Sequence, residues 1–88
     1  MCEFYYVYIL RSLKDGMWYI GFTTDVERRL KEHNGGTNRS TKDRMPLKLI
    51  YFEAYLDERD ARGRERFLKS GSGNRFLRKQ MKNYLKST

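Results

Sequence analysis

The segment from Phe4 to Arg11, FYYVYILR, constrains the fold more than any other part of this sequence. Its aromatic and β-branched residues are typical of a β-strand. Apolar side chains occupy both faces of that strand, which favours a central position in a sheet. The Asp15-Gly16 pair that follows tolerates the positive φ of a tight turn, and Trp18 to Thr23 then supplies a second strand. The start of the chain therefore predicts an antiparallel hairpin.

The sequence after Thr23 predicts a helix, a strand and then two further helices. Thr24 and Glu27 form a predicted capping box for a first helix from about Asp25 to Asn34, ended by Gly35 and Gly36. The later segments are a basic loop (Thr37 to Met45, closed by Pro46), a third strand (Leu47 to Tyr55), a second helix (Glu58 to Ser70, capped by Asp57 and stopped by Gly71) and a third helix (Arg75 to Lys86). The order ββαβαα predicts one α+β domain over residues 1–88, a small three-stranded antiparallel sheet flanked by about three helices.

The charge of the chain points to a polyanionic partner. The 88 residues carry a net charge of +8, and nucleic acid is the commonest polyanion that such a surface attracts. Surplus lysine can also serve solubility alone, so charge by itself leaves that alternative open. No charge pattern separates DNA from RNA, although DNA is favoured as the partner.

Cysteine and hydropathy exclude other classes of protein. Cys2 is the only cysteine, which excludes an internal disulfide and a thiolate zinc site. The apolar run from Phe4 to Leu10 is too short to cross a bilayer, and the preceding Glu3 is unlike the basic start of a signal peptide. We therefore expect a cytoplasmic protein without a membrane partner.

Two polar residues of the first predicted helix lie on or beside its apolar stripe. Val26 and Leu30 define that stripe, and Arg29 and His33 follow the same helical spacing, whereas Arg28 points elsewhere. An arginine that faces inward needs an anion, because a buried unpaired charge is costly. The alternatives are a snorkelling Arg29 and a His33 that merely interacts with the helix dipole.

The second predicted helix repeats the pattern with the opposite charge. Glu65 lies between Ala61 and Leu68 on one face, so its carboxylate points toward the body of the domain. A carboxylate in that position requires a cation, either an arginine or a metal ion. An ion pair with Arg62 or Lys69 is an equally good interpretation of the spacing.

Tyrosines from the two hairpin strands complete the candidate set. Tyr6 and Tyr8 share one face of the first strand, and Tyr19 begins the second strand across the hairpin. Each of these tyrosines can also be an ordinary aromatic core residue.

These residues together carry a resemblance to a known family. Tyr6-Val7-Tyr8 and Tyr19-Ile20-Gly21 resemble the two halves of the GIY-YIG nuclease signature. Asp25 to His33 is similar to the family's Arg-x-x-x-His helix, and Arg64 to Gly71 is similar to the segment with the metal-binding glutamate. Lys48 to Tyr55 matches the strand between them. The similarity covers nearly the whole chain and is closest to small bacterial single-domain members, related to the nuclease domain of the excision-repair C subunit.

The resemblance implies a metal-dependent endonuclease that hydrolyses phosphodiester bonds. It implies that Glu65 holds one divalent cation, Mg²⁺ or Mn²⁺, which polarises the scissile phosphate. Tyr8 would deprotonate or orient the attacking water, and His33 would take the proton onward. Arg29 would offset charge on the phosphate, and Tyr19 would position water or substrate.

The sequence departs from the family pattern at one position and maps uncertainly at another. Tyr6 stands where the name of the motif has glycine. The family's late asparagine corresponds to Asn74 as a catalytic residue, although Asn74 is also a good helix N-cap.

A basic loop and the third predicted helix are expected to hold the nucleic-acid backbone. Their candidate residues are Arg39, Lys42, Arg44, Arg75, Arg78, Lys79 and Lys82. The sequence contains no helix-turn-helix or zinc finger, so specificity is expected from nucleic-acid structure or from a protein partner. The first rival interpretation is a basic nucleic-acid-binding module without catalysis, and the second is a basic amphipathic surface for membranes or proteins.

Overall fold

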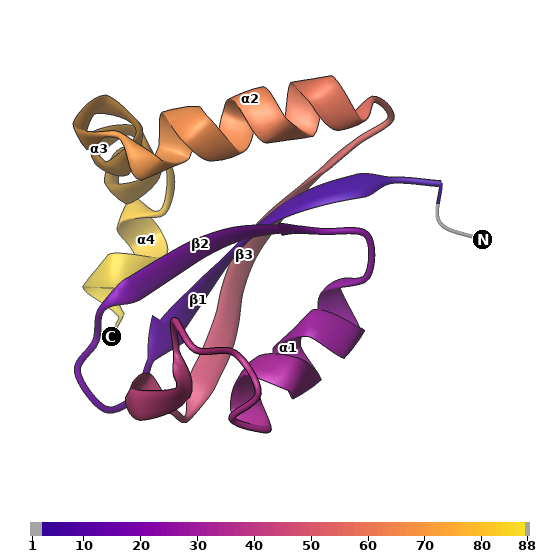
Figure 1. The fold of residues 1–88 in the computed structure, drawn as a ribbon. Helices are drawn as coiled ribbons and strands as arrows, with labels where there is room; N and C mark the ends of the chain where they lie inside the picture. The colour runs from indigo at the N-terminus through magenta and orange to yellow at the C-terminus, as the bar shows by residue number, and fades with distance from the viewer. Residues whose placement is uncertain (1–2, 88) are drawn as a thin grey trace.

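Three antiparallel strands form the centre of the molecule, in the order β2-β1-β3 (Figure 1). The computed structural model describes residues 3–87, so Cys2 lies outside the described residues. Strand β1 (Tyr5–Ser12) pairs on one side with β2 (Trp18–Thr23) and on the other with β3 (Leu47–Tyr55). The predicted central position of the first strand is therefore confirmed.

Helices cover both faces of this sheet. Helix α1 (Val26–Asn34) and the short 3₁₀ helix η1 (Lys42–Arg44) lie on one face, and α2 (Glu58–Lys69) and α3 (Gly71–Gln80) lie on the other (Figure 1). The alternation of side chains along β1 supplies each face with its own core. One core consists of Val7, Ile9, Ile20, Ala61, Leu68 and Leu77, and the other of Tyr8, Leu10 and Leu47 with Tyr19, Leu30, Met45 and Leu49 packed against them.

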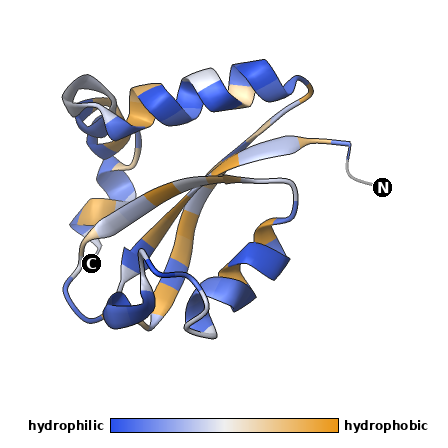
Figure 2. Ribbon diagram, viewed as in Figure 1, coloured by the Kyte–Doolittle hydropathy of each residue, from blue (hydrophilic) through white to orange (hydrophobic). Residues whose placement is uncertain are grey.

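The sheet supplies most of the hydrophobic surface. Figure 2 shows apolar residues concentrated on the strands, whereas α2 is hydrophilic over most of its length. Such an amphipathic helix is stabilised chiefly by packing, because isolated short helices are marginal in water. None of the helices formed by residues 3–87 has the length and apolar character needed to span a bilayer.

The start of the first helix differs from the prediction. Asp25, not Thr24, is the N-cap: its carboxylate accepts a hydrogen bond from the Arg28 backbone N–H at 3.1 Å. Thr23 orients this cap, because its hydroxyl donates to the Asp25 carbonyl and accepts from the Asp25 N–H. An aspartate cap also places negative charge at the positive end of the helix dipole. The predicted cap of the second helix, Asp57, is confirmed.

The last predicted helix has the wrong start, and it is one helix in the prediction where the structure has two, although its end at Lys86 is correct. Helix α3 begins directly after Ser70, whose hydroxyl accepts from the Gly73 N–H, so Gly71 opens a helix instead of separating two. The last predicted helix is divided at Met81, after which α4 (Lys82–Lys86) continues as a separate short helix. The element order is therefore ββαβααα. Gly73 permits the tight α2–α3 corner, because a Cβ there would overlap the Phe67 carbonyl.

Candidate active site

Tyr8 lies at the centre of the face that α1 covers. Its side chain is only 2% exposed, and its hydroxyl oxygen is 2.9 Å from His33 Nε2. The phenol lies over the backbone of Gly21 on the neighbouring strand, where an added Cβ would be 2.5 Å from the Tyr8 hydroxyl. The glycine of the Tyr19-Ile20-Gly21 motif is therefore required by space: a larger residue would displace the Tyr8 hydroxyl.

His33 joins this phenol to a residue that the sequence analysis did not identify. His33 is 0% exposed near the end of α1, and its Nδ1 lies 2.6 Å from the Thr41 hydroxyl oxygen. Thr41 is equally buried, although it belongs to a segment that the sequence predicts only as a polar, basic loop. Tyr19 packs its half-buried ring edge-on against His33, with ring centroids 5.0 Å apart. No periodic signal marks Thr41, because loop residues follow no repeat.

Arg29 also lies on this face, but its partner is not the one that the sequence suggested. Its guanidinium Nη1 is 3.1 Å from Glu32 Oε1, one turn along the same helix, and no ion pair joins it to Glu65. Arg29 Nε is buried and lacks a hydrogen-bond partner among residues 3–87. The guanidinium therefore keeps one unused hydrogen-bond donor beside Tyr8. This agrees with the expectation that an arginine facing inward needs an anion. Arg28 is exposed, as predicted.

Burial and neighbouring charge set the protonation states of this cluster. Burial raises the pKa of the Tyr8 phenol well above its usual value, and the Tyr19 phenol and Glu65 carboxylate act in the same direction. The Arg29 guanidinium opposes this shift. Burial lowers the pKa of His33, with a further contribution from Arg29 and opposition from Glu32. At neutral pH the pair is therefore a neutral phenol beside a neutral imidazole.

Glu65 comes to the site from the opposite layer of the molecule. It shares the inward face of α2 with the fully buried Ala61 and Leu68, as predicted, and its side chain is 14% exposed. Its carboxylate is 3.0 Å from Lys69 Nζ and 3.7 Å from Arg62 Nη1, so the ion pairs named as the alternative interpretation are present. The carboxylate nevertheless lies near enough to the Tyr8 phenol to raise its pKa.

The donor set fits one weakly held divalent cation. Among residues 3–87, no group of three His, Cys, Asp or Glu side chains is arranged to hold a metal ion. Glu65 therefore offers a single carboxylate, and water and phosphate oxygens would supply the other ligands, a mode that Mg²⁺ accepts readily. Both ion-pair partners of Glu65 are long, half-exposed side chains that can rotate away from it.

Asn74 does not join this cluster. It lies half-buried in the first turns of α3, where its side-chain oxygen accepts from Arg78 Nε at 3.1 Å. Within residues 3–87 no hydrogen bond links it to Tyr8, Arg29 or Glu65. It is not a helix cap either, because Ser70 has that position.

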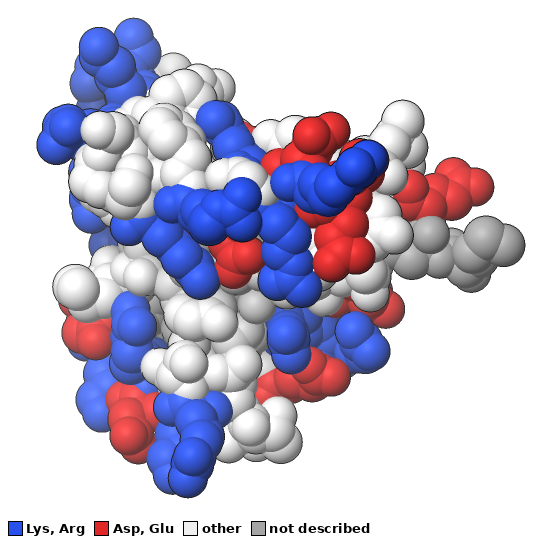
Figure 3. Space-filling view, turned by 45° about the horizontal axis from the view of Figure 1, so that its top comes forward, with Lys and Arg blue, Asp and Glu red and all other residues white. Residues whose placement is uncertain are grey.

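The basic residues expected to bind nucleic acid are distributed over both sides of the sheet. Arg39 and Lys42 are exposed in the loop before β3, whereas Arg44 is partly used by the fold, with Nε 3.8 Å from Asp15 and Nη2 bonded to the Trp18 carbonyl. The residues of the C-terminal helices are all exposed: Arg75, Arg78, Lys79 and Lys82. Figure 3 shows Lys and Arg gathered over the helices that cover the upper face of the sheet and again over the segments below them, with acidic residues interspersed.

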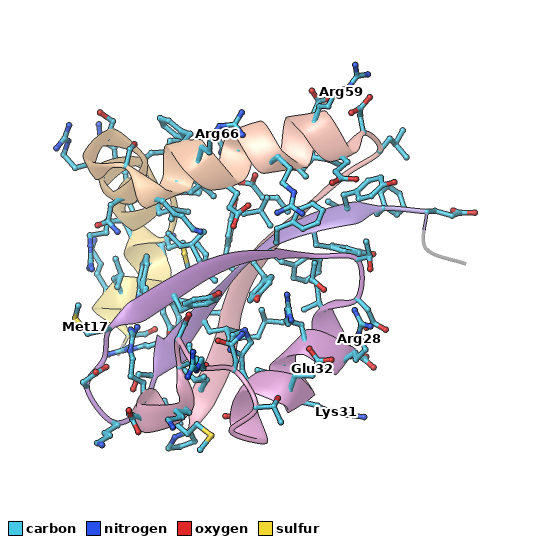
Figure 4. All side chains as sticks on the ribbon, viewed as in Figure 1. Met17, Arg28, Lys31, Glu32, Arg59 and Arg66 are labelled. Carbon is cyan, nitrogen blue, oxygen red and sulfur yellow. The ribbon has the colours of Figure 1, made fainter. Side chains whose placement is uncertain are left out.

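The sequence analysis missed the basic side chains on the outer surface of α2. Arg59 and Arg66 point away from the sheet along this helix (Figure 4). Arg59 forms an ion pair with Asp57 at 2.8 Å, whereas Arg66 is exposed without one among residues 3–87. Helical spacing could have found them, because both positions lie opposite the buried Ala61 and Leu68.

The fold and this cluster define a class of protein. A sequence model described as the GIY-YIG catalytic domain matches residues 4–80, and the chain belongs to that family. It is 42% identical over 73 residues to a UPF0213 protein of Clostridium perfringens, covering 82% of this chain and 77% of that protein. It is 41% identical over 71 residues to a UPF0213 protein of Haloquadratum walsbyi, covering 80% and 79% of the two chains. The solution NMR structure of a UPF0213 protein from Bacillus halodurans is similar with a TM-score of 0.52 and 39% identity, over 84% of this chain and 81% of that one.

Proposed function

We propose that this protein is a divalent-metal-dependent endonuclease that hydrolyses phosphodiester bonds in nucleic acid, with DNA favoured over RNA. One observation carries the proposal: a buried phenol, a buried imidazole and an arginine with an unused donor come together from β1 and α1 beside Gly21 of β2. A protein that only bound nucleic acid would have no need for this polar cluster inside its fold, since phosphate binding uses exposed charge.

The phosphate-binding part of the mechanism belongs to Arg29. Its Nε is buried without a partner, and its guanidinium is half-exposed, so it can donate to a phosphate oxygen without first breaking a strong internal bond. Donors that face the developing negative charge stabilise the transition state more than the ground state. Arg29 therefore offsets charge on the phosphate as the attacking oxygen adds.

The water-activating part belongs to Tyr8, with Tyr19 and His33 around it. The raised pKa of Tyr8 keeps the phenol protonated in the free protein. Its oxygen can accept the proton of an attacking water only when positive charge near it, Arg29 foremost, favours the phenolate. Tyr19, whose ring lies 6.3 Å from that of Tyr8, positions water or substrate in the same space.

Glu65 would hold the divalent cation, which when bound supplies positive charge to the scissile phosphate and to the leaving oxygen. With one carboxylate ligand the affinity is low, so Mg²⁺ or Mn²⁺ must be present in the assay and is lost on dialysis. Glu65 belongs to α2, its side chain is only 14% exposed, and its carboxylate is near enough to act electrostatically on the Tyr8 phenol.

The basic side chains around the site would hold the nucleic-acid backbone without reading its sequence. In this proposal residues 1–88 act as one nuclease domain, and structure-dependent recognition or a protein partner supplies specificity. Asn74 is retained as a candidate that substrate binding would bring into the site, because the hydrogen bond to its side chain comes from the exposed Arg78, which can move.

The test is cleavage by the purified protein of a panel of labelled DNA and RNA substrates, single-stranded, duplex and branched, with Mg²⁺, Mn²⁺ or EDTA. We expect metal-dependent cleavage with nicked or shortened products. Tight, salt-sensitive binding without cleavage of any substrate would instead support the non-catalytic binding module.

A further inference from the structure

Three buried groups form one continuous chain of hydrogen bonds on the α1 face of the sheet. The Thr41 hydroxyl contacts His33 Nδ1 at 2.6 Å, and His33 Nε2 contacts the Tyr8 hydroxyl at 2.9 Å. A neutral imidazole carries one ring hydrogen, so one nitrogen donates and the other accepts. The chain therefore has a direction, and that direction decides what His33 can do for Tyr8.

Thr41, at the buried end of these hydrogen bonds, indicates which ring nitrogen of His33 donates and which accepts. If Nδ1 carried the hydrogen and donated to Thr41, the hydroxyl hydrogen of Thr41 would have no acceptor, because His33 is its only hydrogen-bond partner among residues 3–87. Thr41 is 0% exposed, and although it precedes η1 its hydroxyl makes no helix-capping bond. An unsatisfied donor in such a place is strongly unfavourable.

The opposite direction leaves the free hydrogen where it can be used. With Thr41 donating to Nδ1, the ring hydrogen is on Nε2 and donates to the Tyr8 oxygen. The one hydrogen of this chain without an acceptor among residues 3–87 is then that of the Tyr8 hydroxyl. Although Tyr8 is itself only 2% exposed, its phenol lies beside the half-buried Tyr19 and the half-exposed Arg29, which Thr41 does not. A water molecule or a phosphate oxygen of the substrate can accept it there.

We propose that Thr41 is a positioning residue that donates to His33 Nδ1 and holds the imidazole as its Nε2–H tautomer, so that His33 donates a hydrogen bond to the Tyr8 oxygen. The hydrogen-bond direction stands on geometry alone, and its meaning for catalysis rests on the nuclease function proposed above. His33 in this arrangement stabilises a Tyr8 phenolate, and the phenol's proton leaves to the water molecule or phosphate oxygen that accepts its hydrogen bond, not to His33.

The loop around Thr41 is held in a way that suits this role. The Thr41 N–H donates to the Asn38 carbonyl, and the Thr41 carbonyl accepts from the Arg44 N–H. The side-chain amide of Asn34, directly after His33, bonds both the carbonyl and the N–H of Leu47. Both ends of the loop segment are thereby tied to α1 and β3, which fixes the distance between the Thr41 hydroxyl and the imidazole.

The tautomer can be measured directly, because His33 is the only histidine in the chain. In protein labelled with ¹⁵N-histidine, the long-range couplings of the two ring nitrogens to the ring protons distinguish Nδ1 from Nε2, and their shifts show which one is protonated. At a pH where the ring is neutral, we expect hydrogen on Nε2 in the unaltered protein. Hydrogen on Nδ1 would overturn the proposal without any variant.

Two substitutions test whether Thr41 is the cause. Thr41→Ser keeps the hydroxyl and should keep the Nε2–H spectrum, whereas Thr41→Val keeps the shape and should shift the population toward Nδ1–H. Tyr8→Phe removes the acceptor of the Nε2 hydrogen, and because Thr41 remains, the Nε2–H form should persist. An unchanged tautomer in a folded Thr41→Val protein would overturn the assignment of Thr41.

The kinetics of cleavage provide a second test of the role of Thr41. Thr41→Val should lower kcat roughly tenfold or more with little change in KM, as loss of a histidine-orienting hydrogen bond does elsewhere, and Thr41→Ser should restore it. The NMR result needs no activity, so an unaltered protein that cleaves nothing would refute the nuclease function while leaving the hydrogen-bond direction supported.

Discussion

Polar side chains are buried on both faces of the sheet, but their hydrogen-bond networks differ between the two faces. On the α2 face, Glu53 accepts two bonds from Arg64, at 2.8 and 3.1 Å, and one each from the hydroxyls of Tyr51 and Tyr55. On the α1 face, hydrogen bonds run in a line from Thr41 through His33 to Tyr8, whose phenol also interacts with the Arg29 guanidinium. The first network is closed, and the second has an open end.

This difference separates structural polar groups from reactive ones. Burial works against ionisation of Glu53, but the hydrogen bonds from Arg64, Tyr51 and Tyr55 outweigh it and lower its pKa, while the two phenols have pKa values raised to about 12. Every group in the closed network is satisfied, so it stabilises the fold and has no capacity left for a ligand. On the α1 face, Arg29 Nε has no hydrogen-bond partner among residues 3–87, and the tautomer proposed above would leave the phenol hydrogen of Tyr8 available as well.

The largest expected effect comes from an acidic residue of α2 that acts on the Tyr8 phenol of the other face. Glu65→Gln should abolish metal-dependent cleavage while preserving the fold, because it removes the charge proposed to hold the cation but keeps the shape. Binding of nucleic acid should persist or strengthen, since a negative charge near the phosphates is lost. Cleavage, binding and melting temperature are measured on this one variant.

The matched control is Glu58→Gln on the same helix, where Glu58 pairs with the same Arg62 at 3.5 Å. That variant should cleave normally. A Glu65→Gln protein of full activity would show that Glu65 is only an ion-pair partner of Lys69 and Arg62.

The next effect compares one phenol from each face. Tyr8→Phe should lower the cleavage rate by roughly 10²-fold or more, because it deletes the proposed proton-transfer oxygen from a ring that still packs. Tyr51→Phe deletes a part-buried hydroxyl from the closed network and should leave cleavage unchanged. The cleavage rates and the chemical denaturation of both variants are measured. If the two variants cleave at equal rates, Tyr8 is a core aromatic residue, and the proposed difference between the two faces is wrong.

Opening the closed network should affect stability alone. Glu53→Gln removes the charge that Arg64 pairs with while both remain mostly buried, so the free energy of unfolding should fall by roughly 1–3 kcal/mol. Denaturant unfolding measures this loss. Cleavage assayed well below the melting temperature should match that of the unaltered protein, and a lost activity would place the network in the reactive part of the molecule.

A smaller effect concerns the nucleic-acid surface. Lys42 lies in the loop on the α1 side, whereas Lys79 and Lys82 lie on the C-terminal helices, and all three are exposed. Each alanine substitution at a lysine that contacts a phosphate should weaken binding to all sequences and lower the slope of log affinity against log salt by roughly 0.9 for duplex DNA. Salt titration of the single variants shows which side carries the backbone, and unchanged slopes in all three would exclude these lysines.

The smallest effect is a pH dependence of stability. Burial holds the pKa of His33 below 6.5, so the unfolded chain binds more protons than the folded one as the pH falls beneath that value. The free energy of unfolding should therefore decrease from about pH 7 downward and level off below the folded pKa. The His33→Asn protein should show a flatter profile between about pH 7 and 5.5, where Asp57 and Glu53 stay ionised because their pKa values are lowered. Identical profiles would contradict a neutral buried imidazole.

The local patterns of the sequence determined much of this architecture. The aromatic and β-branched run from Phe4 to Arg11, apolar on both faces, predicted the central strand. The helical spacing around Val26 and Ala61 predicted which faces of α1 and α2 turn inward. These predictions hold because side-chain direction follows from the backbone period alone. The errors, at Thr24, Gly71 and Met81, are at helix ends, where a single hydrogen bond decides the boundary.

The pairing of polar groups was decided only by the tertiary structure. Spacing placed Arg29, His33 and Glu65 on inward faces, but it could not show that Arg29 bonds Glu32, or that the buried partner of His33 is Thr41 from an irregular loop. Nor could it show why Gly21 must be glycine, which depends on the Tyr8 hydroxyl lying across its backbone from the next strand. A helix or strand period fixes the direction of a side chain, whereas a hydrogen bond requires a distance of about 3 Å between atoms of distant segments, which only the packed chain defines.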